Sequence, residues 1–187
     1  MGLKKKVEPI ADVSDDFEEK REHPRTKEQL ISDLNSSDSD VRRGAVRDLS
    51  GQKDAHDAFI YRLPQEDDPT VSEALFSALE HDMTQSHASQ VITMLKSEHV
   101  QLRNGAIELM QQNPDIFAAN VNLLMNDEDP DTRIFCVDII GAVAHIDAVN
   151  WLHQFALNDD NENGVGTALD KLAEIAAVST LDILKNV

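Results

Sequence analysis

The sequence predicts an all-α fold, an α-solenoid of about five helical hairpins followed by a C-terminal half-repeat. Residues 35–49 (NSSDSDVRRGAVRDL) and 126–140 (NDEDPDTRIFCVDII) share one order of acidic turn residues, arginine and apolar side chains. The same register recurs five times, and a period of about thirty residues is typical of stacked repeats. The apolar residues are mainly Leu, Ile, Val and Ala, with few aromatics, which favours helices.

The second helix of each hairpin is defined by a marker position that recurs at spacings of 30, 31, 30 and 32 residues. Small or apolar side chains follow each marker at offsets of four, five and eight residues, which places them with the marker on one helical face. The five markers are Val41, Val71, Leu102, Thr132 and Gly164.

The first helix of each hairpin is indicated by an apolar cluster about seven to twelve residues before the marker. Leu30, Ile31 and Leu34 form the first of these clusters, and the breaker-rich turns SSDSD, QEDDPT, NDEDPD and NDDNENG separate the two helices. One hairpin of this length cannot bury its own apolar stripe, whereas stacked hairpins share a continuous core. The half-repeat is expected at residues 178–187.

The repeated stretches DSDVRRGAVRDLSG and DPDTRIFCVDIIG resemble HEAT repeats, in particular the short bacterial type called phycobilisome-lyase-like. The likeness covers residues 26 to 187 and implies an α-solenoid whose second helices line a concave, binding face. It also implies a polar ladder between neighbouring repeats, formed by an Asp of the turn and the Arg that follows it. Asp40 with Arg42 and Asp131 with Arg133 match this pattern, whereas repeat three keeps only Arg103.

The chain divides into an N-terminal extension, residues 1–27, and a repeat solenoid, residues 28–187. The extension has seven basic and seven acidic residues and no repeat pattern. Residues 14–24 are predicted to form a short helix that Ser14 caps and Pro24 ends. This segment is either a frayed tail or an arm that docks on the first repeat or on a partner.

The composition argues against several classes of protein. The formal net charge is −18, all of it outside the extension, and a body this acidic repels phosphate backbones, so we expect no nucleic-acid binding. No apolar stretch is long enough to span a bilayer, and no secretory signal pattern is present. The single Cys136 excludes an internal disulfide and fits a reducing compartment. We therefore expect a cytoplasmic protein that does not bind membranes.

No catalytic motif is evident, so we expect that the protein is not an enzyme and carries no cofactor. The seven histidines show no metal-binding spacing, and they are interpreted as surface or helix-end residues. The sequence around Cys136 places its thiol on the core face, which favours packing over nucleophilic chemistry.

The stretch of residues 159–170 has a weak metal-binding motif and also a structural role as a turn. The oxygen-bearing residues match the ligand order of an EF-hand calcium loop, with Gly164 at the sharp turn. The last ligand is Asp instead of the usual Glu, and the stretch is also the turn of repeat five, so no metal is the favoured interpretation. The candidate ligands are Asp159, Asn161, Asn163 and Asp170.

The side chains left outside the core, at offsets two, six and nine from each marker, define the candidate binding surface. They change from basic at the N-terminal end to acidic at the other end, which suits a protein or peptide with a basic segment. The alternative is a solvated helix face. The residues singled out are Arg43, Arg47, Glu73, Asn104, Glu108 and Asp138.

The favoured function is therefore a non-catalytic protein-binding adaptor, scaffold or assembly factor, expected to be a monomer. The alternative is a bilin lyase-like or other tetrapyrrole-handling protein, because similar repeats occur in bilin lyases. HEAT-like DNA glycosylases need a basic concave face, which the charge of −18 argues against.

Overall fold

A computed structural model describes residues 25–80 and 83–185, with side chains through residue 176. All regular elements in this part of the chain are helical, and they pair into five hairpins. The hairpins are α2 (Lys27–Asp33) with α3 (Ser39–Leu49), α4 (His56–Arg62) with α5 (Pro69–Leu79), α6 (Ala88–Leu95) with α7 (Val100–Gln112), α8 (Pro114–Met125) with α9 (Pro130–Ala142), and α10 (Ala148–Asn158) with α11 (Glu162–Lys185). Three 3₁₀ turns accompany them: η1 (Lys53–Ala55), η2 (Leu63–Gln65) and η3 (Gln85–His87).

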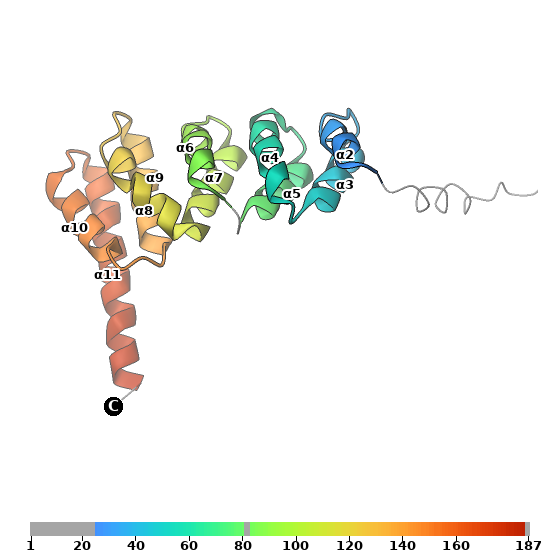
Figure 1. Cartoon of the computed structure of the whole chain (residues 1–187). Coiled ribbons are helices and arrows are strands. Elements are labelled where there is room, and N and C mark those ends of the chain that lie inside the picture. The colour runs from blue at the N-terminus through green and yellow to red at the C-terminus, as the bar shows by residue number, and fades with distance from the viewer. Residues whose placement is uncertain (1–24, 81–82, 186–187) are drawn as a thin grey trace, which may run out of the picture.

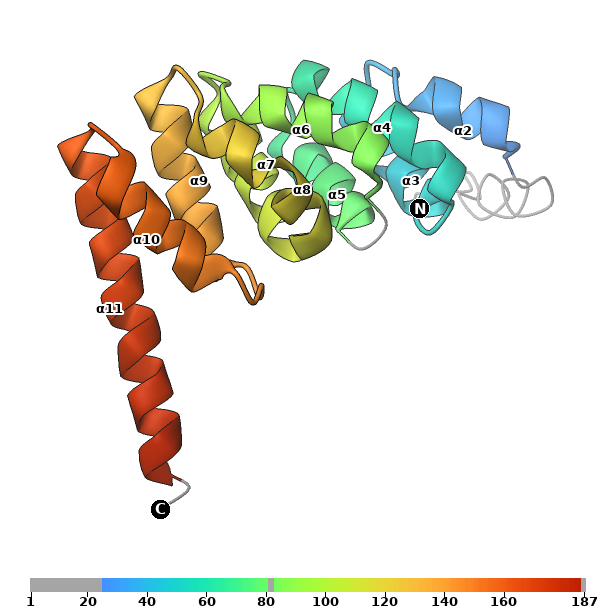
Figure 2. The same cartoon turned by 60° about the vertical axis from the view of Figure 1, so that its left-hand side comes forward.

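The hairpins stand side by side in chain order and form one row, from α2 at one end to α10 and α11 at the other (Figure 1). The second helices contact one another in succession, α3 with α5, α5 with α7, α7 with α9 and α9 with α11. The C-terminal part of α11 projects beyond the row (Figure 2). The predicted all-α solenoid is therefore confirmed, and it is the architecture that the likeness to HEAT repeats implies.

The turns before the second helices are acidic because their Asp side chains cap the start of the helix. Asp38, Asp68 and Asp129 each accept a hydrogen bond from the backbone N–H two residues further on, at 2.9, 2.9 and 3.1 Å. These bonds satisfy donors that the first helical turn leaves without a partner. Proline at the first position of α5 and α9 has no N–H to lose there.

The core follows the predicted register. The residues four positions after the five markers are completely buried. The markers themselves are buried or half-buried, so none faces open solvent. The residues at offset four are Ala45, Leu75, Ala106, Cys136 and Ala168. Burial of such side chains is the main stabilising term, at roughly 25 cal/mol per Å² of apolar area.

Two predicted segments lie at the ends of the row. The short helix expected at residues 14–24 falls outside the described residues. The half-repeat expected at residues 178–187 is helical as far as Lys185. It is the C-terminal part of α11 and not a separate helix.

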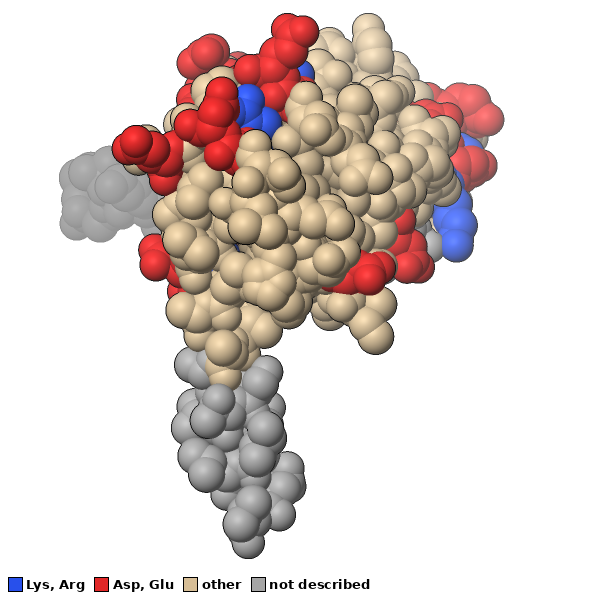
Figure 3. Space-filling model, turned by 90° about the vertical axis from the view of Figure 1, so that its left-hand side faces the viewer, with Lys and Arg blue, Asp and Glu red and all other residues tan. Residues whose placement is uncertain are grey.

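The charged residues are unevenly distributed over this row. At its C-terminal end the surface is a broad uncharged area, and Asp and Glu lie at its margin (Figure 3). Every helix found between residues 25 and 185, masked residues apart, is too short or too polar to cross a membrane.

Candidate protein-binding surface

The predicted surface residues lie on the second helices, where consecutive contacts between helices line them up along one face of the row. Arg43 and Arg47 are on α3, Glu73 on α5, Asn104 and Glu108 on α7. All five are exposed. Asp138, on α9, is half-buried.

The structure brings three of these residues into a single groove between α5 and α7. The groove has a volume of about 660 Å³. Glu73, Asn104 and Glu108 line it together with Glu80 and the apolar side chains of Phe76 and Val100. The remaining lining residues are Ser77, Gln101 and Gly105.

The groove exists because α5 and α7 approach closely at Gly105. A Cβ atom on this residue would lie 2.2 Å from Cε2 of Phe76, closer than any two such atoms can approach. The Phe76 ring therefore occupies the space that a side chain at position 105 would fill. Together with Val100, which is 58 % exposed, it gives the groove an apolar component.

The groove is strongly acidic. Glu73, Glu80 and Glu108 line it, and no Lys or Arg does. Glu73 and Glu108 make no ion pair with any residue of the described part of the chain. Two carboxylates in one depression are therefore available to a cation that approaches from solvent.

The other predicted residues lie outside this groove. Arg43 forms an ion pair with Asp40 at 2.9 Å, and Arg47 forms one with Asp48 at 3.2 Å. The basic end of the predicted stripe is thus locally neutralised. Sequence reasoning missed Phe76, Val100 and Gly105 as groove residues. A glycine inside a predicted helix was the available signal, because it indicates close approach of a neighbour.

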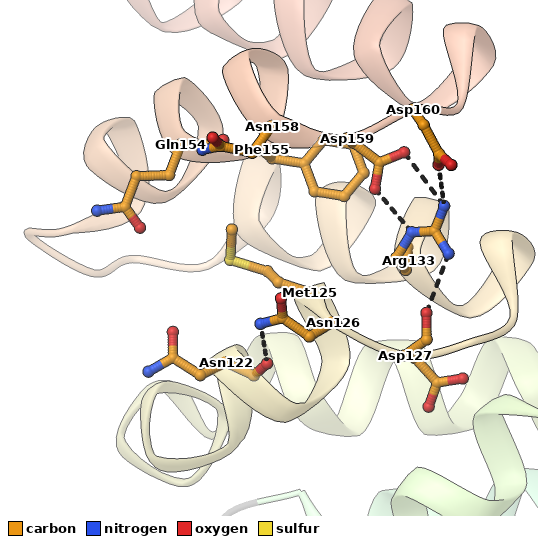
Figure 4. A pocket seen from close by; sticks show the side chains of 10 residues that line it. All are labelled: Asn122, Met125, Asn126, Asp127, Arg133, Gln154, Phe155, Asn158, Asp159 and Asp160. Atoms are coloured by element: carbon orange, nitrogen blue, oxygen red, sulfur yellow. Dashed lines mark hydrogen bonds and ion pairs between the residues drawn. The ribbon is translucent and has the colours of Figure 1, made fainter.

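The polar ladder between repeats differs in its partners from the predicted one. Arg42 donates to both carboxylate oxygens of Glu66, at 2.8 and 2.6 Å, and Glu66 belongs to the turn of the next repeat. Arg133 likewise binds Asp159, at 2.7 and 3.3 Å, and Asp160 at 3.0 Å (Figure 4). Arg133 also donates to the backbone carbonyl of Asp127 in its own turn, at 3.0 Å. Side chains two apart on a helix point in different directions, so Asp40 does not pair with Arg42, nor Asp131 with Arg133.

Repeat three departs from this ladder. The carboxylate of Asp127 in the following turn binds Lys96 at 2.6 Å. Arg103 donates to the carbonyl of Ser97 at 2.8 Å, and its guanidinium lies 5.2 Å from the centre of the Phe135 ring. Its buried Nε has no hydrogen-bond partner in the structure.

The candidate calcium ligands have structural roles. Asp159 binds Arg133, and the Oδ1 atom of Asn161 accepts from the N–H of Gly164 at 2.9 Å. Asn163 and Asp170 lie inside α11, which begins at Glu162. A loop that wraps a cation must bend around it, whereas Asn163 and Asp170 are part of a helix. Within the described residues, no group of three His, Cys, Asp or Glu side chains converges on a metal-sized site.

Two predictions about single residues concern Cys136 and the histidines. Cys136 is fully buried, as expected for a packing residue, and burial raises the pKa of its thiol. His56 and His87 are buried and lie at helix ends, which is one of the two kinds of position expected for the histidines. Both begin first helices against the core, and Nε2 of His87 lies 3.0 Å from the carboxylate of Asp57.

These features define the chain as an α-solenoid of helical hairpins with an acidic groove on its second-helix face. No family model matches the sequence, and a comparison with curated proteins finds no match. Among solved structures, a chain in the complex of CpcE and CpcF of phycocyanin lyase from Nostoc sp. PCC7120 is similar over 91 % of this chain and 71 % of that chain. The sequence identity is 19 % and the TM-score is 0.46. An engineered protein is similar over 81 % of this chain and 79 % of its own, with 18 % identity and a TM-score of 0.39.

Proposed function

We infer that the protein is a non-catalytic adaptor whose groove between α5 and α7 binds a basic segment of another protein. The observation that carries this proposal is the acidic lining of the groove, in which Glu73 and Glu108 have no basic partner in the described structure.

The chemistry of the groove fits Lys or Arg side chains. Carboxylates form short, charge-assisted hydrogen bonds with ammonium and guanidinium groups. The aliphatic part of a Lys or Arg side chain packs on apolar surface while its charged end stays polar, and Phe76 and Val100 offer such surface. The net charge of −18 additionally attracts a basic partner over longer distances and speeds association.

The test is a charge-reversed variant with a control of equal net charge. Glu73→Lys combined with Glu108→Lys changes the groove, whereas Glu98→Lys combined with Glu128→Lys changes two exposed acids elsewhere. The probe is a fluorescein-labelled peptide of eight lysines separated by alanines, followed by fluorescence anisotropy at 150 mM NaCl. Because long-range attraction is equal in both variants, the difference between them reports the groove alone.

We expect the groove variant to bind at least tenfold more weakly than the control variant. Equal dissociation constants for the two variants contradict the proposal. In a pull-down from the native cell lysate, partners that wild type and control recover should be missing with the groove variant. The competing function, tetrapyrrole handling, would be indicated by visible absorbance of the purified protein.

A further inference from the structure

The last hairpin exposes apolar side chains at positions that are covered in the hairpins before it. Leu169 of α11 is 54 % exposed, whereas the residues at the same offset in α3 and α9, Val46 and Val137, are 1 % and 0 % exposed, and those in α5 and α7 are half-buried. At offset eight, Leu172 is half-buried, and its four counterparts in α3, α5, α7 and α9 are completely buried.

The preceding helix has an exposed apolar stripe as well. Ile146, just before α10, is 95 % exposed, and Val149 and Leu157 of α10 are 40 % and 83 % exposed. The spacing of Val149 and Leu157 places them on one side of the helix together with the exposed His153, and Ile146 lies in the turn before it. Helix α10 contains no Asp, Glu, Lys or Arg, which is unusual in a chain of charge −18. The uncharged area in Figure 3 is this end of the row. We call Ile146, Val149, Leu157 and Leu169 the end face.

The rest of the row shows what kind of element covers such positions. Each second helix from α3 to α9 packs against the second helix of the following hairpin. A face built from this repeat is therefore complementary to another helix, which would lie where a sixth hairpin would begin. Exposed apolar patches rimmed by polar residues mark interaction sites in soluble proteins.

The charge around the end face indicates the charge that a helix bound there would carry. Residues 143–176 contain six acidic residues and one basic residue, Lys171, which binds Glu174 at 3.5 Å. Asp147 and Asp160 have side chains that are 56 % and 96 % exposed, and Asp160 is paired with Arg133 at 3.0 Å. A second copy of this chain would bring two such acidic margins together, and that repulsion disfavours it as the occupant.

We propose that the end face binds an amphipathic helix of another protein, with an apolar stripe against α10 and α11 and Lys or Arg residues along its flanks. Leu157 and Leu169 supply the apolar contact, and the acidic surplus of residues 143–176, including the exposed Asp147, attracts the basic flanks. This site lies on different helices from the groove between α5 and α7, so either site can exist without the other.

The experiment uses the full chain and a synthetic 18-residue peptide with Leu at helical spacing and Lys at the other positions. A scrambled peptide of the same composition has no apolar face. Trp151, the single tryptophan, lies in α10 with its ring stacked on His145 at 4.5 Å, so its emission reports binding at this helix. The substitutions Leu157→Asn and Leu169→Asn remove the apolar contacts without changing charge. The control is Tyr61→Asn on α4, which replaces another large side chain with 72 % exposure.

We expect the amphipathic peptide to shift the Trp151 emission of the wild type. The double variant should bind it at least tenfold more weakly, and Tyr61→Asn should bind within twofold of the wild type. The Glu73→Lys and Glu108→Lys groove variant should bind the peptide as tightly as the Glu98→Lys and Glu128→Lys variant of equal net charge, which separates this proposal from the proposed function.

Three results would overturn the proposal. The first is a shift of Trp151 emission by the scrambled peptide that is as large as the shift by the amphipathic one. The second is a double variant that binds the amphipathic peptide as tightly as the wild type does. The third is a dimeric mass in light scattering that Leu157→Asn converts to a monomer, which would identify a second copy as the occupant.

Discussion

At the scale of single residues, the junction between the first two hairpins depends on Glu66. Its side chain is fully buried and accepts hydrogen bonds from Arg42, from Arg62 at 3.1 and 3.0 Å, and from the backbone N–H groups of Asp67 and Asp68. Arg42 is itself 5 % exposed and also donates to the carbonyl of Ser36 at 2.8 Å. A buried ion pair stabilises a fold only when its polar atoms are satisfied in this way.

This environment makes stability depend on pH. Burial alone would raise the pKa of Glu66, but hydrogen bonds from Arg42, Asp68 and Arg62 outweigh it and lower the pKa from 4.5 to about 2. Below pH 4.5 the Glu66 carboxyl is therefore protonated in the unfolded chain but stays ionised in the folded chain. The free energy of unfolding falls as the pH approaches 2. The shift corresponds to roughly 3 kcal/mol.

We predict that Glu66→Gln is less stable than the wild type at pH 7 and that the difference narrows below pH 4.5. The variant cannot lose a carboxylate interaction that it lacks, so its unfolding free energy depends less on pH. Urea unfolding followed by circular dichroism between pH 7 and pH 3 measures both proteins. A difference that stays constant over this range would contradict the assigned role of Glu66.

At the scale of helices, the two glycines Gly105 and Gly166 show opposite uses of the same residue. Gly105 in α7 is held against the Phe76 ring of α5, whereas the position of a Cβ on Gly166 in α11 has no atom within 4 Å. Glycine costs helix stability of about 1 kcal/mol relative to alanine at both sites. Only at Gly105 does close packing offset this cost.

Two alanine substitutions test this difference. Gly105→Ala should lower the unfolding free energy by about 1–3 kcal/mol, because the methyl group must displace the Phe76 ring. Gly166→Ala should raise it by about 0.5–1 kcal/mol, because the helix gains propensity and meets no obstacle. Chemical denaturation of both variants provides the comparison, and equal effects of the two substitutions would show that α5 and α7 are not tightly packed at Gly105.

How far the sequence predicts each element follows from the range of the interactions involved. The hairpins and their core positions, such as Leu49 and Ile140, are predictable because apolar spacing within one helix determines burial. The acidic partners of the ladder arginines were not predictable. Arg42 binds Glu66 across the junction between two hairpins, and the geometry of that junction depends on both of them. The groove between α5 and α7 was missed for the same reason. Its acidic residues were predictable one at a time, but their convergence required the approach of Gly105 to Phe76.

At the scale of the whole molecule, the row of hairpins offers two surfaces of opposite character. The groove between α5 and α7 is acidic, and the end face on α10 and α11 is uncharged with an acidic margin. Each hairpin contacts mainly its neighbours in the row, so these surfaces are fixed by local packing and can serve different contacts.

The net charge of −18 also acts on the molecule as a whole. Acidic residues crowded into one compact row repel one another, and unfolding relieves that repulsion. Salt screens charges over about 10 Å at 0.1 M, so it should weaken this repulsion more than the buried pair of Arg42 and Glu66. We therefore predict that raising NaCl from 20 to 300 mM, on the order of a tenfold change in screening ions, increases Tm.

The variant with Glu98→Lys and Glu128→Lys provides the matched test, because each substitution raises the net charge by two and the pair together changes it from −18 to −14. It should melt at a higher temperature than the wild type in 20 mM NaCl, and its Tm should rise less with added salt. Exposed ion pairs such as Arg43 with Asp40 contribute little and oppose this trend weakly. Differential scanning calorimetry of both proteins at the two salt concentrations decides the matter. If Tm falls with salt in the wild type, attractive surface pairs outweigh self-repulsion, and the acidic surface is balanced locally instead of being available to a basic partner.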